Sequence, residues 1–393
     1  MAERLLIKNG KLITTNTILG GYSLLIEDGI VAEITPGDLK AGNCETIDAS
    51  DLYVSPGFID LHIHGGNGSD VMDATIDDLL TVTSFHAKGG TTGLLATTAA
   101  DSLENILVAI DAVHHAQSKK GVGCGILGIH IEGPYFNFEK KGCHLAEAIR
   151  NPAPNEYLQL LDATDQIRLM TLAPEIEGAD RLIQELSKRN IVPSCGHSNA
   201  SYNQIARAVE LGLKHSTHLY CAMSGVIKTG PKREGGIIES TLLLDDLTTE
   251  VIADGRHLPP ELMKLAVKCK TTDRLAVVSD AMRGAGMPDG VYTFGSKNGT
   301  EAIVKGGVAT MPDNTGYASS TIQMNDTIRV MRDMVGVRLE EAVKMASFVP
   351  ARILGIDAQR GSLAVGKAAD IVLFDEEICV HRTIVGGVTI PTS

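Results

Sequence analysis

The alternation of apolar and polar positions is of the β type at both ends of the chain. Residues 5–34 hold short apolar runs interrupted by Asn9-Gly10 and Asp28-Gly29, and each of these pairs is typical of the tight turn of a β-hairpin. The C-terminal stretch has the same character, in "GSLAVGKAADIVLFD" and "HRTIVGGVTI". We therefore expect the two termini to form one small β-sandwich domain together.

The middle of the chain follows a different pattern, in which short apolar runs alternate with helix-length stretches. The runs end at polar or glycine residues, as in "GCGILGIHIEGP", "IRLMTLAPE", "IVPSCGHS", "LKHSTHLY", "TTEVIADGRH" and "DRLAVVSDAM". Segments such as "ADRLIQELSKRN" and "SYNQIARAVELG" predict the helices between them. Repeated βα units predict a parallel sheet covered by helices, so we expect an α/β fold with a TIM-like (β/α)8 barrel. A doubly wound sheet is the alternative.

The domain boundaries are expected where the two patterns change. We assign residues 1–54 and 352–393 to the small β domain and residues 55–351 to the catalytic barrel. The chain has 393 residues, of which 44% are hydrophobic, so it can bury a sizeable core.

Charge and composition narrow the range of partners and locations. The formal net charge of −13 argues against nucleic acid or an anionic membrane as the main partner, and the lack of tryptophan disfavours a platform for stacked bases. The N-terminus "MAERLLIKNGKLITT" has no apolar core of a signal peptide, and no apolar run approaches the length of a membrane span. Seven cysteines without a C-x-x-C fit reduced thiols, so we expect a cytoplasmic protein.

Titratable side chains stand at the ends of most predicted barrel strands. In a barrel of this kind the carboxyl ends of the strands converge on the face that carries the active site. The strand-end residues are His62, His64, Glu132, His197, His218, His257 and Asp280. We expect them to meet at one site. His215 lies three residues before His218, and we expect it to face the other way.

The segment "VSPGFIDLHIHGGNG" carries His62 and His64 one residue apart. Residues i and i+2 of a strand share a face, so both imidazoles point into the barrel mouth while Ile63 points toward the helices. Two imidazoles and a carboxylate such as Glu132 suit zinc, iron or manganese. A single His-x-His is equally consistent with two ordinary polar histidines at a strand end, and the later strand-end histidines favour the metal.

Two further strand-end residues suit proton transfer and charge stabilisation. Asp280 is placed to take a proton from an attacking water and to pass it to a leaving group, unless it only caps a helix. His257, in "IADGRHL", is placed to donate a hydrogen bond to a substrate carbonyl, unless it is a surface loop residue.

Substrate-binding candidates lie outside the strand ends. His144 occupies the glycine-bearing loop "EKKGCHLAE". The segment "SGVIKTGPKREGG" is locally basic, and a guanidinium such as that of Arg233 matches the geometry of phosphate oxygens. The alternative for this segment is a solvated charged surface.

Together these segments resemble the amidohydrolase superfamily and, within it, the N-acetylglucosamine-6-phosphate deacetylases. The resemblance spans essentially the whole chain and rests on "PGFIDLHIHGG", "GIHIEGPY", "KKGCH", "SCGHSNA", "STHLYCAMS", "DGRH" and "VSDAM". It implies hydrolysis of the N-acetyl group of N-acetylglucosamine 6-phosphate to glucosamine 6-phosphate and acetate. The resemblance is also the source of the residue roles that follow.

The resemblance implies a divalent metal cofactor, such as zinc, iron or manganese, with one or two ions per subunit. Glu132, His197 and His218 match the ligands of the ion that the family always keeps. His62 and His64 match a pair that binds a second ion in some members. Two cysteines near these histidines, Cys195 and Cys221, are expected to be packing residues rather than thiolate ligands.

The resemblance also implies roles in catalysis and substrate binding. Asp280 matches the general acid and base, His257 the residue over the acetyl carbonyl, and His144 a sugar-contacting histidine of a lid loop. Further matches bind the phosphate: Cys221 and Ala222 through main-chain N–H groups, and Arg233 from the neighbouring subunit, which implies a homodimer. The family usually has Asn at the position of Cys221, and the segment around Arg233 also departs from the family pattern.

Several alternatives stay open at this point. The substrate could be the epimer N-acetylgalactosamine 6-phosphate, because the sequence does not resolve the configuration of one hydroxyl. A cyclic amidase or a deaminase would use similar strand-end histidines. A noncatalytic scaffold on the same fold is the alternative from another functional class.

Overall fold

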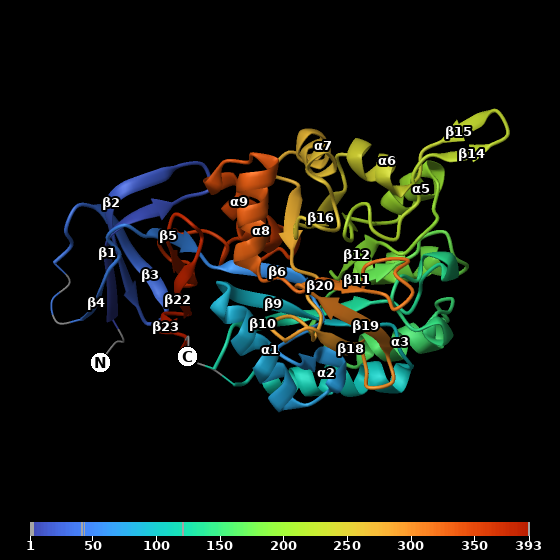
Figure 1. The fold of residues 1–393 in the computed structure, drawn as a ribbon, viewed down its shortest axis with the longest axis horizontal. Coiled ribbons are helices and arrows are strands. Elements are labelled where there is room, and N and C mark those ends of the chain that lie inside the picture. Colours follow the sequence, from blue (N-terminus) through green and yellow to red (C-terminus); the bar gives the residue numbers. More distant parts are fainter. Residues whose placement is uncertain (1–3, 41, 43, 120–121, 392–393) are drawn as a thin grey trace.

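The computed structural model describes residues 4–40, 42, 44–119 and 122–391, which form two sheet-centred parts (Figure 1). A sheet built from both ends of the chain lies at one end of the molecule. A parallel barrel wrapped by helices forms the rest. The expected α/β fold with a barrel and a separate β domain is confirmed, whereas the residue boundaries of the two domains stay a prediction.

The terminal sheet joins the two ends of the chain. Its eight strands run in the order β23-β22-β21-β5-β1-β2-β3, and β4 pairs with β1. The strands are β1 (Arg4–Ile13), β2 (Ile18–Glu27), β3 (Ile30–Pro36), β4 (Glu45–Asp48), β5 (Tyr53–Pro56), β21 (Ile371–Phe374), β22 (Val380–Val385) and β23 (Val388–Thr389). Because β5 pairs antiparallel with β21, the C-terminal strands complete the sheet that the N-terminal strands begin.

The two predicted hairpin turns have different outcomes. Asp28-Gly29 forms the turn between β2 and β3, with φ of 51° and 78°, so this prediction is confirmed. The hairpin at Asn9-Gly10 is wrong, because β1 continues through it with shifts of register that indicate a β-bulge. A Cβ at Gly10 would lie 2.4 Å from a methyl carbon of Val54, so glycine allows the neighbouring chain to approach closely. The turn lies at residues 14–17, where Thr14 N–H donates to Thr17 O.

The barrel sheet consists of eight parallel strands. They are β6 (Phe58–Ile63), β9 (Thr91–Thr98), β10 (Gly125–Glu132), β11 (Ile167–Leu172), β12 (Val192–Cys195), β13 (His215–Ser216), β16 (Thr248–Ile252) and β17 (Leu275–Val278). The ring closes between β17 and β6, where Asp280 N–H donates to His62 O at 2.9 Å. The strand-end residues named from the sequence leave out two of the eight strands, β9, which ends at Thr98, and β11, which ends at Leu172.

The predicted helices cover the outside of the barrel (Figure 1). The two segments singled out from the sequence form α4 (Ala179–Lys188) and α5 (Tyr202–Glu210), which confirms them. The other α-helices are α1 (Ile76–Lys88), α2 (Leu103–Ala116), α3 (Pro154–Asp162), α6 (Ile237–Leu243), α7 (Pro260–Lys270), α8 (Met324–Val330), α9 (Leu339–Ala346) and α10 (Phe348–Ile353). Among the described residues, none of the helices is both long and apolar enough to cross a membrane.

Short helices and strands lie at the barrel mouth and in the connections between the barrel strands. The short 3-10 helices are η1 (Val71–Asp73), η2 (Phe138–Lys140) and η3 (Ala146–Ala148), and η4 (Met331–Val335) is a π-helix. The accessory strands are β7 (Gly65–Gly66), β8 (Ser69–Asp70), β14 (Ile227–Thr229), β15 (Lys232–Glu234), β18 (Gly290–Phe294), β19 (Thr300–Lys305) and β20 (Val308–Thr310). The hairpin of β14 and β15 projects from the barrel at the end opposite the terminal sheet (Figure 1).

The connection between the two sheets gives a test of packing. Only Gly57 separates β5 from β6, and a Cβ there would lie 2.1 Å from Oγ1 of Thr92, a buried residue of β9. We expect Gly57→Ala to lower the free energy of unfolding by about 1–3 kcal/mol, because the overpacked chain must shift. Denaturant titration measures this. The control is Gly20→Ala in β2, where nothing lies within 4 Å, and equal midpoints for the two variants would contradict the prediction.

Candidate functional site

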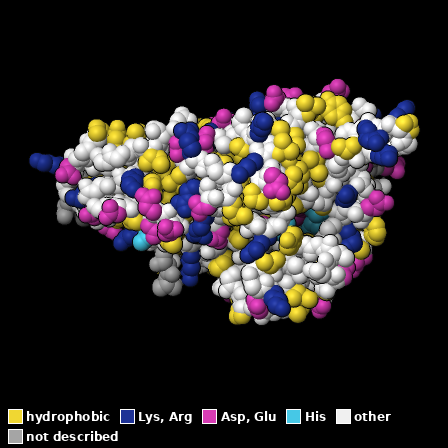
Figure 2. All heavy atoms as spheres, turned by 45° about the horizontal axis from the view of Figure 1, so that its top comes forward, with side chains coloured by type: hydrophobic (Ala, Val, Ile, Leu, Met, Phe, Trp, Pro, Cys, Tyr) yellow, Lys and Arg dark blue, Asp and Glu magenta, His cyan; other side chains and the backbone are white. Residues whose placement is uncertain are grey.

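The carboxyl ends of the barrel strands open into a cavity of about 330 Å³. Figure 2 shows histidine side chains in a hollow on the barrel half of the molecule. The predicted site residues that line the cavity are His64, Glu132, His144, His197, His218, Cys221, Ala222, His257 and Asp280. His62 is fully buried. Arg233 is exposed and does not line the cavity.

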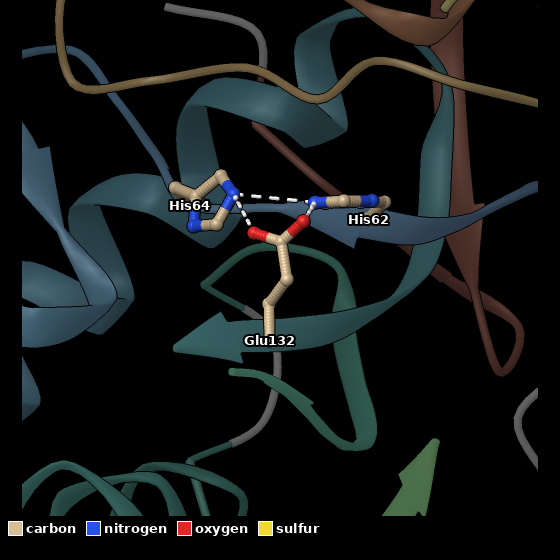
Figure 3. Close-up of side chains that lie close together, drawn as sticks. All are labelled: His62, His64 and Glu132. Carbon is tan, nitrogen blue, oxygen red and sulfur yellow. Dashed lines mark hydrogen bonds and ion pairs between the residues drawn. The ribbon is translucent and has the colours of Figure 1, made fainter. Parts of the chain in front are cut away.

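One cluster of ligand atoms is formed by His62 in β6, His64 just beyond this strand and Glu132 at the end of β10, whose side chains point toward one another (Figure 3). The two Nε2 atoms of the histidines lie 3.2 Å apart. Glu132 Oε1 lies 3.3 Å from Nε2 of His62, and Oε2 lies 3.1 Å from Nε2 of His64. Ligand atoms about 2.0–2.2 Å from a common zinc ion are separated by about this distance, so the donor set fits a divalent ion.

A second cluster shares the same carboxylate. Nε2 of His197 and Nε2 of His218 lie 3.0 Å apart. Glu132 Oε1 lies 3.3 Å from the first and 3.2 Å from the second. The structure therefore brings the other four predicted ligands around Glu132, in two groups that could each hold an ion with it. Their role as metal ligands stays a prediction.

Contacts at Nδ1 determine which ring nitrogen is available to a metal. His62 Nδ1 donates to Glu250 Oε1 at 2.8 Å, and His197 Nδ1 donates to the carbonyl oxygen of Lys140 at 2.8 Å. Both acceptors lack a hydrogen, so in the neutral ring Nδ1 carries the proton and the lone pair lies on Nε2. These are the tautomers that a metal ligand needs, and the partners also fix the ring orientation.

His144 has the opposite tautomer. Its Nδ1 accepts a hydrogen bond from the backbone N–H of Ala100 at 3.1 Å, so the proton of the neutral ring lies on Nε2. That Nε2 lies 3.2 Å from Glu132 Oε2, close enough for His144 to count by distance among candidate ligands with Glu132 and His197. The protonated Nε2 makes His144 a hydrogen-bond donor into the cavity rather than a ligand.

The electrostatics of the cavity favour ionised carboxylates, whereas its imidazoles differ. Burial lowers the pKa of His62 and His64, but the carboxylates of Glu132 and Asp280 outweigh burial and raise both, to about 9 for His64. Burial alone would raise the pKa of Glu132, but His62 and the other surrounding imidazoles hold this pKa well below its usual value. Burial also opposes ionisation of Asp280, and His62 and His64 outweigh it and lower the pKa to about 2. For His197, burial lowers the pKa to about 4, which keeps the ring neutral and able to bind a metal.

The two candidates for chemistry flank these clusters. Asp280 Oδ1 lies 3.4 Å from Nε2 of His64 and 3.5 Å from Nε2 of His62. His257 is tied to Asp254, whose two oxygens accept from its backbone N–H and from its Nδ1, each at 2.8 Å. Since Nδ1 is occupied, Nε2 of His257 is left to act on a bound molecule.

The residues that were predicted to bind a phosphate are only partly brought together in one subunit. The N–H of Cys221 donates to His218 O at 2.9 Å, whereas that of Ala222 has no partner among the described residues. Arg233 lies in β15 of the projecting hairpin, and basic side chains gather at that end of the molecule (Figure 2). Of the predicted anion contacts, Ala222 therefore lies at the cavity and Arg233 lies away from it.

The thiols do not belong to the candidate metal clusters. Burial raises the pKa of Cys195 to about 12, and burial likewise raises the pKa of Cys221. Among the residues that the structure describes, the groups with suitable spacing for a metal contain histidine and glutamate but no cysteine.

Glu250, in the middle of β16, is a site residue that was not predicted from the sequence. Its Oε1 accepts from His62 Nδ1 at 2.8 Å and from the N–H of His218 at 3.3 Å, and its Oε2 accepts from His215 Nε2 at 3.2 Å. Burial would raise the pKa of Glu250, but His215 and His62 hold it below its usual value. A charged residue inside the apolar run "TTEVIAD" was the available signal, because a buried carboxylate requires partners.

The expected orientation of His215 was wrong. Its ring is buried and faces Glu250, the same residue that supports His218. The strand β13 ends at Ser216, and His218 has a φ of 31°, so the alternation of a strand does not extend to His218. Both histidines therefore reach the inside of the barrel.

Comparison with known protein families identifies the amidohydrolase family model over residues 53–390. The N-acetylglucosamine-6-phosphate deacetylase of Bacillus subtilis (strain 168) is 36% identical, covering 98% of this chain and 97% of the relative. The N-acetylgalactosamine-6-phosphate deacetylase of Escherichia coli O157:H7 is 35% identical, covering 96% and 97%.

Solved structures show the same similarity. The N-acetylglucosamine-6-phosphate deacetylase of Pasteurella multocida matches with a TM-score of 0.91 and 30% identity, covering 98% of this chain and 99% of that one. A mutant N-acetyl-D-glucosamine-6-phosphate deacetylase from Mycobacterium smegmatis, in complex with N-acetyl-D-glucosamine-6-phosphate, matches with a TM-score of 0.90 and 29% identity, covering 99% and 100%.

The contacts of Glu250 lead to a prediction about metal affinity. A glutamine at this position keeps one acceptor oxygen and replaces the other with a donor, so one of His62 and His215 loses its partner. We expect Glu250→Gln to weaken zinc binding about 10–100-fold, measured by competition with a chromogenic chelator. Glu301→Gln, which changes an exposed carboxylate of β19, is the control and should bind zinc as the wild type does. Equal zinc affinity in the two variants would show that Glu250 does not support the metal ligands.

Proposed function

Since the chain belongs to the amidohydrolase family, we propose that it hydrolyses the N-acetyl group of N-acetylglucosamine 6-phosphate to glucosamine 6-phosphate and acetate. The observation that carries this proposal is the arrangement around Glu132: Nε2 atoms of four histidines lie 3.1–3.3 Å from its carboxylate oxygens, and Asp280 adjoins them at the cavity wall. Deacetylases of phosphorylated amino sugars are similar to this chain over nearly its whole length.

The proposed metal ligands are those around the shared carboxylate. Glu132, His197 and His218 would hold one divalent ion, and His62 and His64 would hold a second with Glu132. Imidazole and carboxylate donors suit zinc, iron or manganese. When bound, such an ion polarises a carbonyl oxygen and makes water a stronger nucleophile at neutral pH.

Asp280 is the proposed acid and base of the reaction. Its low pKa keeps it ionised, so it can accept a proton from the water that attacks the acetyl carbonyl. It then passes this proton to the amide nitrogen, which leaves as the amine of the sugar when the C–N bond breaks. Both steps need one carboxylate near the carbonyl carbon and the nitrogen, which its position at the cavity wall allows.

His257 and His144 are the proposed donors to the substrate. An imidazole that donates through both nitrogens is positively charged, and Asp254 beside Nδ1 of His257 balances that charge. His257 can therefore donate from Nε2 to the acetyl oxygen as this oxygen gains negative charge. His144 has its proton on Nε2 and would donate to the sugar.

The phosphate site is proposed to need two subunits. The N–H of Ala222 is the main-chain donor on the cavity wall, with Cys221 at the adjacent position. Arg233 would come from the projecting hairpin of a second subunit, because in its own subunit this exposed residue does not line the cavity. This arrangement makes the active protein a homodimer. A cytoplasmic location completes the proposal and rests on the acidic, thiol-bearing sequence.

N-acetylgalactosamine 6-phosphate remains a second candidate substrate. A deacetylase of that sugar from Escherichia coli O157:H7 is 35% identical to this chain, and one of the gluco epimer from Bacillus subtilis (strain 168) is 36% identical. The two identities do not separate the epimers. Substrate comparison must decide between them.

The role of Asp280 predicts a variant that binds metal but does not turn over. Asp280→Asn cannot accept the proton, so we expect kcat to fall by about 10³-fold while metal content, measured by elemental analysis, stays at the wild-type level. Asp313→Asn, in an exposed loop, is the control with unchanged kcat. Near-normal turnover of Asp280→Asn would contradict the proposed mechanism. Chelation should abolish acetate release by the wild type, and added zinc or manganese should restore it.

The phosphate site predicts a substrate preference and its loss. Acetate release should be fastest with a 6-phosphorylated N-acetyl sugar and at least tenfold slower with unphosphorylated N-acetylglucosamine. Arg233→Ala should raise KM for the phosphorylated sugar by about tenfold and leave the unphosphorylated sugar unaffected, because an Arg–phosphate contact is lost. Arg181→Ala, on the exposed side of α4, is the control. A preference for the neutral sugar would remove the proposed role of Arg233.

A further inference from the structure

Ser319, which was not among the residues predicted from the sequence, contacts the proposed acid and base from a loop. It lies between β20 and α8 and lines the cavity. Its Oγ donates a hydrogen bond to Oδ1 of Asp280 at 3.0 Å, and its exposed fraction is 6%. A buried hydroxyl that donates to an ionised carboxylate makes one of the stronger kinds of hydrogen bond.

The backbone holds this hydroxyl in place. The N–H of Ser320 donates to Asp280 O at 2.8 Å, and the N–H of Met282 donates to Ser320 O at 2.9 Å. These two bonds fasten the loop to the segment that carries Asp280. Ser319 itself has a φ of 62°, a left-handed conformation that a side chain makes unfavourable. Glycine would adopt this conformation without a Cβ penalty, so serine is present here despite its conformational cost.

The contacts of Asp280 distinguish its two carboxylate oxygens. Oδ1 faces Ser319 Oγ and, at 3.4 Å and 3.5 Å, Nε2 of His64 and Nε2 of His62. Among the described residues, Oδ2 has no hydrogen-bond partner. The contacts therefore hold the carboxylate through Oδ1, and Oδ2 is the oxygen that is free to accept and release a proton.

We propose that Ser319 is a positioning residue for Asp280: by fixing Oδ1 against the histidines, it keeps Oδ2 as the oxygen that exchanges the proton. This inference rests on the proposed function. In the hydrolysis, Oδ2 accepts one proton from the attacking water, and the same proton then moves to the amide nitrogen as the C–N bond breaks. Asp280 returns to its ionised form at the end of each turnover.

The conformation of Ser319 allows a test that separates positioning from stability. Ser319→Gly removes the hydroxyl and relieves the left-handed backbone, so its melting temperature should stay within about 3 °C of the wild type. Ser319→Ala removes the same hydroxyl but keeps a Cβ at positive φ, so it should melt lower than Ser319→Gly. A residue with only a structural role would show activity that follows these melting temperatures.

The expected result is that both variants lose kcat about tenfold or more, by equal factors, with KM within about twofold of the wild type. Steady-state acetate release from N-acetylglucosamine 6-phosphate and from its galacto epimer gives kcat and KM for each variant. Asn314→Gly is the matched control, because Asn314 is an exposed residue of the same loop with a φ of 57°. It should keep the wild-type kcat.

Other outcomes would overturn the inference in distinguishable ways. A wild-type kcat in Ser319→Gly, or a kcat that falls only where the melting temperature falls, would show that the hydroxyl does not position Asp280. A raised KM with unchanged kcat would make Ser319 a substrate contact instead. A wild-type enzyme with full metal content that releases no acetate from either sugar would overturn the proposed function and this inference with it.

Discussion

The burial of one carboxylate among imidazoles is the constraint on which the rest of this structure depends. Glu132 is almost inaccessible to solvent, yet its oxygens face Nε2 atoms from the ends of several barrel strands. An ionised group in such a place is stable only if positive charge or hydrogen-bond donors surround it. A closed parallel barrel provides them, because its strands all end at the same rim and bring distant histidines to one point. The requirement for a balanced charge at this point is also what suits it to a divalent cation.

The histidines around this carboxylate are held by hydrogen bonds to a second layer of groups that would not bind the substrate. Glu250 holds His62, His215 and the backbone of His218, and the carbonyl oxygen of Lys140 holds His197. The contacts at Nδ1 of His62 and His197 fix a tautomer as well as a position. His197 and His144 illustrate the effect of the tautomer. Both rings lie near the same carboxylate, but in the neutral state His197 carries its proton on Nδ1 and His144 carries it on Nε2. Distance alone would group both as ligands.

The small β domain and the barrel are assembled by chain segments that lie far apart in the sequence. The strands β5 and β21 pair across more than 300 residues, and Asp280 reaches back to His62 to close the barrel ring. The same closure places Asp280 beside His62 in β6 and His64 just beyond it, so a feature that completes the fold also assembles the site. The projecting hairpin with Arg233 is the exception, since its proposed role requires a second copy of the chain.

The sequence alone determined the fold class, the hairpin at Asp28-Gly29 and most of the residues that meet at the site. It could do so because strand period, turn residues and the position of polar groups at strand ends are local properties of the chain. The tertiary structure decided the bulge at Asn9, the inward position of His215, the bridging role of Glu250 and the contact between Ser319 and Asp280. Each of these depends on the register between segments distant in the sequence, and hydrophobic periodicity reports only which face a residue occupies, not which residue it will face.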